Sequence, residues 1–150
     1  MKGVQKLFLK TAYPLLKVYW FLLRPKTTGV RCLITNDNQV LLIQHSYGPS
    51  NWSVPGGGVK SSESFVAAAK REVFEEVGIE ASCVKKLGQV FYDAEYKKDT
   101  IWIFHAEVTS DDFKIDDLEI VNAQWFPLED VPKNSSPLLK QFLALYYLKN

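Results

Sequence analysis

The hydrophobic pattern changes character along the chain. Residues 1–25 are rich in Leu, Phe, Tyr and Trp, and their charged residues are all basic. Residues 29–58 form short apolar runs between turn residues, and residues 64–77 repeat apolar side chains every three or four positions. Short bounded runs predict strands, and a three-to-four repeat predicts an amphipathic helix. We therefore expect a helical segment, then a strand region, then a surface helix.

Six short β-type runs predict strands, at Gly29–Thr35, Gln39–Gln44, Trp52–Pro55, Val84–Tyr92, Thr100–Val108 and Ala123–Phe126. The triplet Asn36-Asp37-Asn38 is a turn between the first two, and the polar segment Asp93–Asp99 joins the fourth and fifth in a hairpin. Strands mixed with a few helices, without regular β-α alternation, indicate an α+β or α-β-α layered domain.

Two helices are predicted within this domain. The first runs from Ser64 to Val77, with Ser64 as N-cap and Gly78 as the C-terminal stop. The second is an apolar helix over Pro137–Leu148. The chain is thus divided into an N-terminal helical arm, residues 1–25, and a domain of residues 26–150.

The arm is amphipathic, and Pro14 is expected to split it into two helices. Its basic residues fall within a sector of about 80° on a helical wheel; they are Lys2, Lys6, Lys10, Lys17 and Arg24. Apolar residues lie on the other side, at Phe8, Leu15, Val18, Tyr19 and Leu22.

Three roles remain open for this arm. Lys10 and Lys17 leave no apolar run near the roughly 20 residues that cross a bilayer, and no cleavage site follows, so neither a membrane span nor a signal peptide is favoured. One interpretation is an arm that packs on its own domain or on a second subunit of a homodimer. The other is a peripheral anchor on the inner membrane surface.

Composition restricts the class of protein. The chain has 150 residues, 47% of them hydrophobic, which suits one globular domain with its own core. A formal net charge of +1 carries no footprint for binding a nucleic-acid duplex. Cys32 and Cys83 belong to no C-x-x-C pair, which favours a reduced cytoplasmic setting over a disulfide framework.

Three glutamates on the first predicted domain helix carry the candidate chemistry. Glu72, Glu75 and Glu76 lie at i, i+3 and i+4, in a different sector from the apolar face formed by Val66, Ala69, Val73 and Val77. Like charges at these spacings destabilise a helix by roughly 0.2–0.5 kcal/mol each, and the helix dipole disfavours anions in the last turns. A bound Mg²⁺ or Mn²⁺ would reverse that cost; the other interpretation is a solvated acidic face.

The residues around the three glutamates favour the metal-binding interpretation over the solvated acidic face. The stretch from Gly57 to Ile79, GGVKSSESFVAAAKREVFEEVGI, matches G-x5-E-x7-R-E-U-x-E-E-x-G-U, where U is apolar, and so resembles the signature of the Nudix hydrolase family. At roughly 6% usage for each residue type, seven fixed letters coincide by chance on the order of once in 10⁹ starting points.

This resemblance implies a fold and a metal site. The implied fold is a Nudix-type α-β-α sandwich with a mixed sheet. The implied ligands of Mg²⁺, or of Mn²⁺ as a substitute, are the carboxylates of Glu72, Glu75 and Glu76 with the backbone carbonyl of Gly56. Glu63 and Arg71 form a pair that braces the loop and orients Glu72.

The resemblance also implies a reaction, attack of water at phosphorus in a pyrophosphate linkage. Glu72 is the first choice as general base. Glu119 is a candidate for an additional base or ligand, and equally an exposed acid beside Asp116 and Asp117. The expected substrate is a small nucleoside diphosphate derivative: a nucleotide, a dinucleotide or a nucleotide sugar.

Substrate contacts are less defined. His45 follows a strand near the expected entrance, and aromatic rings at Trp52, Tyr47 and Tyr92 could stack on a base. Tyr96 lies near a position where dinucleoside polyphosphate hydrolases of the family carry a tyrosine, whereas the proline mark of ADP-ribose hydrolases and the arginine mark of coenzyme A hydrolases are absent. Two other functions remain: a non-catalytic nucleotide-binding sensor, and a membrane-associated hydrolase of a lipid-linked diphosphate.

Overall fold

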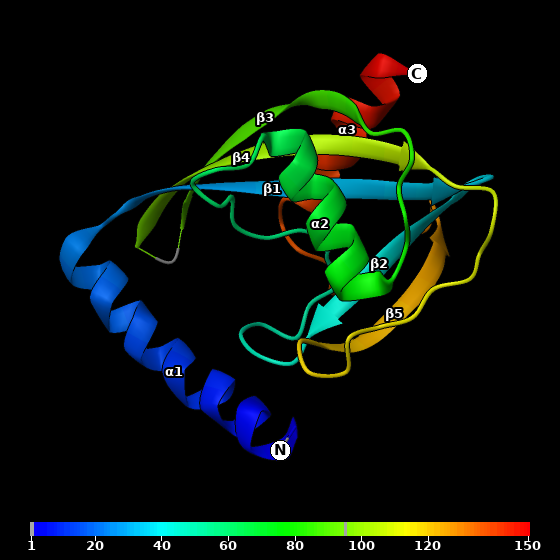
Figure 1. Cartoon of the computed structure of the whole chain (residues 1–150). Coiled ribbons are helices and arrows are strands. Elements are labelled where there is room, and N and C mark those ends of the chain that lie inside the picture. The colour runs from blue at the N-terminus through cyan, green and yellow to red at the C-terminus, as the bar shows by residue number, and fades with distance from the viewer. Residues whose placement is uncertain (1, 95) are drawn as a thin grey trace.

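A mixed five-stranded sheet lies between helices in the computed structural model, which describes residues 2–94 and 96–150 (Figure 1). Nothing is described of the side chains at positions 2–4, 6, 9, 10 and 94. The elements are α1 (Lys2–Leu23), β1 (Lys26–Asn36), β2 (Gln39–His45), α2 (Phe65–Val77), β3 (Lys85–Ala94), β4 (Lys97–Glu107), β5 (Ile120–Pro127) and α3 (Leu139–Lys149).

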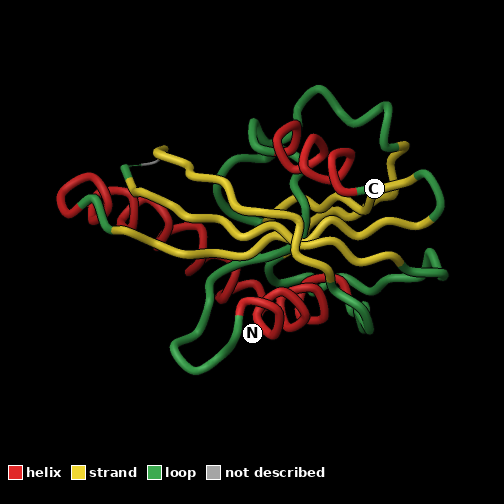
Figure 2. The backbone as a smooth tube through the Cα atoms, turned by 90° about the horizontal axis from the view of Figure 1, so that it is seen from above, coloured by secondary structure: helices red, strands yellow, loops and turns green. Residues whose placement is uncertain are grey.

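The strand order is β3-β4-β1-β2-β5. β1 and β4 run parallel, in a register that pairs Arg31 with Ile103, and the other neighbours are antiparallel. Figure 2 shows the sheet from its edge, with α2 on one side and α3 on the other. This mixed sheet between helical layers confirms the expected α+β, α-β-α architecture.

Strand alternation produces one hydrophobic core on each side of the sheet. Alternate residues of β1, namely Val30, Cys32 and Ile34, pack with the apolar face of α2, whereas Leu33 packs on the opposite side with Leu139 and Phe142 of α3. Because successive side chains of a strand point to opposite faces, a strand covered on both sides must be apolar nearly throughout. The unbroken burial of β1 from Cys32 to Thr35 has this cause.

The α2 helix has the ends that the sequence predicts. Ser64 is the N-cap, and its hydroxyl accepts a hydrogen bond from the Ala67 amide at 3.2 Å. Gly78 ends the helix in the left-handed region, and its amide donates to the Phe74 carbonyl at 2.9 Å. The caps fix where α2 starts and stops, and therefore which turns lie next to the sheet.

The buried face of α2 differs from the predicted one. Ala68, Ala69, Val73 and Val77 are fully buried, but Val66 is 41% exposed. Glu76 lies within the buried sector, with 3% of its surface exposed. One of the three carboxylates is therefore held inside the layer between α2 and the sheet.

The predicted strand over Trp52–Pro55 is not formed. This segment makes isolated bridges, Ser53 with Ile43 of β2 and Trp52 with Ser135, before the Pro55 carbonyl accepts from Cys32 of β1. Proline has no amide to continue a ladder, so the segment crosses from one strand to the next instead of extending either.

Two further elements, the β3–β4 hairpin and α1, are longer than the sequence predicts. The β3–β4 hairpin turns tightly between Ala94 and Lys97, so most of the predicted linker Asp93–Asp99 belongs to the strands. The α1 helix continues through Pro14, which was expected to divide it. A proline removes one intrahelical hydrogen bond and crowds one turn, and good helix formers on both sides carry this helix past it.

In Figure 1 the arm precedes the left end of β1, the central strand, and runs beside the domain. No helix in the described residues is long and apolar enough to cross a membrane.

Gly78 provides a test of the α2 C-cap. Gly78→Ala should lower the free energy of unfolding by about 1–2 kcal/mol, because an alanine is strained in the left-handed region. Gly78 has φ +67°, and a Cβ there would lie 3.1 Å from the Lys114 carbonyl oxygen. Urea unfolding measures the loss. Gly58→Ala is the matched control, since a Cβ at Gly58 meets no atom within 4 Å; equal losses in both variants would contradict the cap.

Candidate functional site

A glycine loop brings the site together by running between β1 and α2. The Gly57 carbonyl accepts from the Val30 amide at 2.9 Å, and the Pro55 carbonyl accepts from Cys32 at 2.9 Å. At Gly56, φ is +143° and a Cβ would lie 2.2 Å from the Val30 oxygen. At Gly57 a Cβ would lie 2.7 Å from the Glu72 carboxylate. Only glycine allows so close an approach of loop, strand and helix.

Arg71 connects this loop to the acidic residues of α2. Its guanidinium donates two hydrogen bonds to Glu63, at 2.6 and 3.0 Å, and one to the Gly58 carbonyl at 3.0 Å. It also donates to Glu72 at 2.7 Å and to Glu75 at 2.9 Å. The hydrogen bonds from Arg71 and from the Lys60 amide lower the pKa of Glu63 to about 2. Glu63 is therefore an anion at neutral pH, as a bidentate brace requires.

Glu76 occupies a different environment. Its Oε2 accepts a hydrogen bond from the Gly56 amide at 2.8 Å. Burial raises the pKa of Glu76 to about 8, against the opposing effects of Arg31 and the Gly56 amide. Burial thus favours the protonated form of this carboxyl.

His45 lies beside Glu76, at the end of β2. The two side chains approach to 3.8 Å between Nδ1 and Oε1. Burial, with the nearby Arg31, lowers the pKa of His45 to about 4, so the ring is neutral and the contact is not an ion pair. Nδ1 is buried and has no hydrogen-bond partner within residues 2–94 and 96–150. An unpartnered buried nitrogen is costly unless it serves a ligand or an ordered water.

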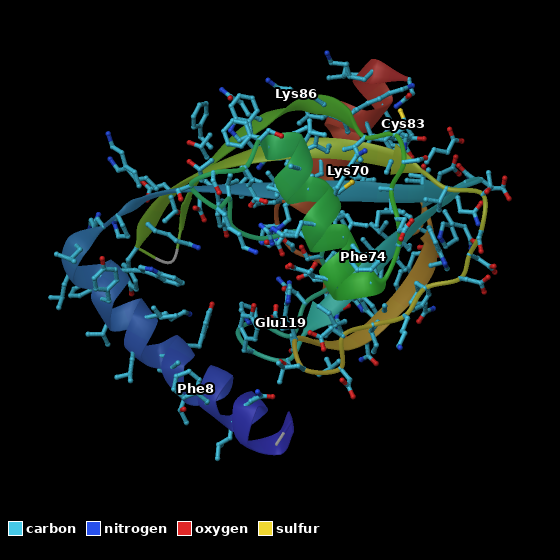
Figure 3. All side chains as sticks on the ribbon, in the orientation of Figure 1. Phe8, Lys70, Phe74, Cys83, Lys86 and Glu119 are labelled. Atoms are coloured by element: carbon cyan, nitrogen blue, oxygen red, sulfur yellow. The ribbon has the colours of Figure 1, made fainter. Side chains whose placement is uncertain are left out.

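Glu119, in the segment before β5, belongs to the same electrostatic environment. Burial raises its pKa, with further contributions from Asp116, Glu72 and Glu75. Figure 3 shows Glu119 next to the lower end of α2. Its backbone carbonyl accepts from the Ser46 amide at 2.7 Å, which fixes it beside the end of β2.

The donor set fits a hard divalent cation in its chemistry. Four carboxyls influence one another electrostatically here, those of Glu72, Glu75, Glu76 and Glu119. Glu72 and Glu75 contribute to the raised pKa of Glu119, and Glu72 and Glu119 contribute to that of Glu76. Oxygen-rich anionic sites suit Mg²⁺ and Mn²⁺. As oriented, no three acidic, histidine or cysteine side chains of the described chain converge as a finished ligand set. The hydrogen bonds of Glu72 and Glu75 to Arg71 account for that arrangement.

A cleft of about 330 Å³ adjoins the glycine loop. Its polar and aromatic lining comes from α1, α3 and the strands β1 to β4, and it includes Tyr13, Trp20, Arg31, His45, Tyr47 and Lys97. The Tyr47 ring centroid lies 5.5 Å from that of His45 and 6.1 Å from that of Tyr13. Positive groups and aromatic faces thus surround a space next to Gly56 and Gly57.

The predicted substrate contacts divide into two groups. His45, Tyr47 and Tyr92 line the cleft. Trp52 lies outside its lining and packs edge-on against Phe126 at 4.9 Å, with the core on the α3 side. Tyr96 sits at the β3–β4 turn with its ring 5.1 Å from that of Phe21 of α1.

Sequence reasoning missed several lining residues. Arg31 is the one charged side chain in the run Gly29–Thr35, and a charge in a covered strand could have marked it. Tyr13, Trp20 and Lys97 carry no comparable signal, because they reach the cleft only through the way α1 folds against the domain.

Comparisons with known proteins show the family of the chain. A family model described as the NUDIX domain matches residues 25–146. Nudix hydrolase 6 of Arabidopsis thaliana is 34% identical over 135 residues, covering 81% of this chain and 47% of that protein. Diphosphoinositol polyphosphate phosphohydrolase 3-alpha of Mus musculus is 36% identical over 100 residues, covering 65% of this chain and 60% of that protein.

The fold has solved counterparts as well. A MutT NUDIX hydrolase from Burkholderia pseudomallei superposes with a TM-score of 0.74 at 25% identity, covering 80% of this chain and 97% of the other. The chain thus spans nearly the whole of that structure but only 47–60% of the length of the two curated relatives.

The buried Glu76 predicts a pH-dependent stability in EDTA. Its folded pKa is about 8 against an ordinary value of 4.5, so between these values the folded state holds a proton that the unfolded state releases. The free energy of unfolding should therefore fall as pH rises through this window, by at most about 1.4 kcal/mol per pH unit. Glu76→Gln removes this slope, and urea unfolding from pH 6 to 9 measures it. The exposed control Glu80→Gln should keep the slope; parallel curves for wild type and Glu76→Gln would refute the prediction.

Proposed function

The chain belongs to the Nudix family, and from this we propose that it is a metal-dependent hydrolase of the pyrophosphate linkage in a nucleoside diphosphate derivative. The observation that supports the proposal most is the cluster of Glu72, Glu75 and Glu76 on α2, next to a cleft lined by Arg31 and Lys97. Anionic carboxylates bind the cation, and the cationic side chains bind the phosphates.

We assign the cation to Glu72, Glu75 and Glu76 with the Gly56 carbonyl, and we propose Mg²⁺, with Mn²⁺ as a substitute. When bound, the metal neutralises the diphosphate, lowers the pKa of the attacking water and stabilises the leaving oxygen. Glu72 is the proposed general base, because Arg71 holds its Oε1 at 2.7 Å and so fixes its orientation. Glu119 is the proposed additional base or ligand.

The cleft supports a nucleotide-type substrate. Tyr47 and Tyr92 offer ring faces on which a base can stack, and the neutral His45 keeps a buried Nδ1 free for a polar contact. A non-catalytic sensor could have lost the acidic residues, whereas this chain retains Glu72, Glu75 and Glu76. Free cysteines, Cys32 buried and Cys83 exposed, suit the cytoplasmic location that we propose.

The deciding experiment is a substrate panel. It holds ADP-ribose, dinucleoside polyphosphates, nucleotide sugars and nucleoside triphosphates, and a diphosphoinositol polyphosphate because one relative is named for that substrate. Each is tested with Mg²⁺, Mn²⁺ or EDTA. Metal-dependent release of phosphate or nucleotide from one class supports the proposal and names the substrate. Folded protein that binds Mg²⁺ but cleaves none of them would favour the sensor or a lipid-linked substrate.

Removing one metal ligand tests the assignment directly. Glu75→Gln should lower metal-dependent turnover by about 100-fold or more. Its fold should be unchanged, since Glu75 is half exposed and the substitution relieves like-charge repulsion. Glu80→Gln, an exposed acid just beyond α2, is the control and should retain full activity. Full activity in Glu75→Gln would remove that residue from the site.

Arg31 is predicted to bind substrate phosphate. Arg31→Gln should raise KM by about 10-fold or more, the value of a lost hydrogen bond between charged groups. The kcat should change less, because Arg31 lies in the cleft and not among the proposed ligands. Lys133→Gln, an exposed basic residue elsewhere, should leave KM unchanged. An unaltered KM for Arg31→Gln would place the phosphates elsewhere.

A further inference from the structure

The α1 helix turns its more polar side toward the domain. Tyr13 contacts Tyr47 and would touch a Cβ added at Gly48, at 3.1 Å. Trp20, seven residues on, lies under the Lys97 ammonium at 4.4 Å. Lys17 lies between them in the sequence, with its ammonium 5.2 Å from the Tyr13 ring centroid. On a helical wheel this side coincides with the basic sector of the arm.

The opposite side of α1 is uncovered and, apart from Thr11, apolar. We call it the outer stripe: Leu7, Phe8, Leu15, Val18 and Leu22, which lie within about 100° of one another on the wheel. Their exposed fractions are 63%, 69%, 72%, 57% and 70%. Figure 1 shows α1 standing apart from the sheet, with open space beyond its far side. Scattered exposed leucines are ordinary, but a contiguous apolar stripe along a helix marks a contact surface.

The α1 helix presents the opposite side to the domain from the one expected of an arm that is stabilised by packing on its own domain. Such an arm would bury its apolar side against the domain and expose its charges. Here the contacts to the domain are made by Tyr13, Trp20 and Phe21, while the outer stripe faces away. Of the alternatives that the sequence leaves open, packing on its own domain does not account for the stripe.

The charge of the arm distinguishes the two remaining candidates for covering the outer stripe, a second copy of this chain and a lipid surface. Residues 1–25 contain five basic residues and no acidic one. Because the basic sector lies on the side of α1 away from the stripe, two copies packed stripe to stripe would gain nothing from these charges, whereas an anionic lipid surface attracts each basic residue that comes near it by about 1 kcal/mol. In a helix that lies at the interface, long lysine and arginine stems can carry their charges from the polar side toward the headgroups. Charges of one sign only therefore favour lipid over a second copy.

We propose that α1 lies flat on an anionic membrane surface, with the outer stripe among the acyl chains and the catalytic cleft on its water-facing side. Tyr13 and Trp20 then form the wall of the cleft that is nearest the lipid. Membrane binding in this form needs no turnover, so it can hold or fail independently of the proposed hydrolase activity.

The test is co-sedimentation of the full chain with vesicles of phosphatidylcholine, with and without phosphatidylglycerol. Wild type should bind the phosphatidylglycerol vesicles and dissociate as salt is raised, because the charges are screened. Leu15→Gln/Leu22→Gln should lower the partition coefficient by at least about tenfold. Glutamine is a good helix former, so the helix is retained, and circular dichroism checks this.

The matched control is Phe91→Gln/Leu148→Gln, which removes two apolar side chains that are 72% and 82% exposed on β3 and α3. It should bind the vesicles as wild type does. Wild type that stays in the supernatant, or equal binding by both double variants, would overturn the proposal. A dimer seen by light scattering and abolished by Leu15→Gln/Leu22→Gln would overturn it as well, since a second copy would then cover the stripe.

Discussion

The guanidinium of Arg71 bonds to three carboxylates and to the carbonyl of Gly58, and it thereby joins the glycine loop to α2. Glu72 and Glu75 repel each other on adjoining turns, and the helix dipole gives them no help at that end. A single five-donor cation offsets both costs while keeping the two carboxylates beside the loop. Lysine could not replace it, because its ammonium lacks the planar fork that binds Glu63 bidentately.

Glu76 differs from Glu72 and Glu75 because it has no hydrogen bond to Arg71 and is buried. It accepts from a backbone amide inside the layer between helix and sheet, where burial favours the protonated form. Because burial favours the protonated form of Glu76, the cation that we propose would have to displace this proton, and its binding would depend on pH. The neutral His45 next to it adds no charge to oppose that cation.

Local signals in the sequence predicted α2, its caps and the acidic cluster, because capping residues and i, i+3, i+4 spacing act within a few residues. The layered fold followed from alternating apolar runs. The burial of Glu76 did not, since the wheel cannot show which sector meets the sheet. The cleft wall at Tyr13 and Trp20 depends on contacts with Tyr47 and Lys97, and no short-range pattern encodes those contacts. The prediction that Pro14 divides the arm into two helices was wrong, because the lost hydrogen bond and the steric crowding of a proline affect only one turn of α1.

The parallel pairing of β1 with β4 also governs the order in which the molecule can be built. β1 supplies Arg31 and the backbone that fixes the glycine loop, yet its long ladder is with β4, where Arg31 pairs with Ile103. Closing so large a loop costs chain entropy before any contact is gained, and such topologies fold slowly. During synthesis on the ribosome, the backbone groups of β1 that pair with β4 therefore stay unpaired until β4 has emerged. The glycine loop and α2, although complete in sequence long before, acquire their final geometry only then.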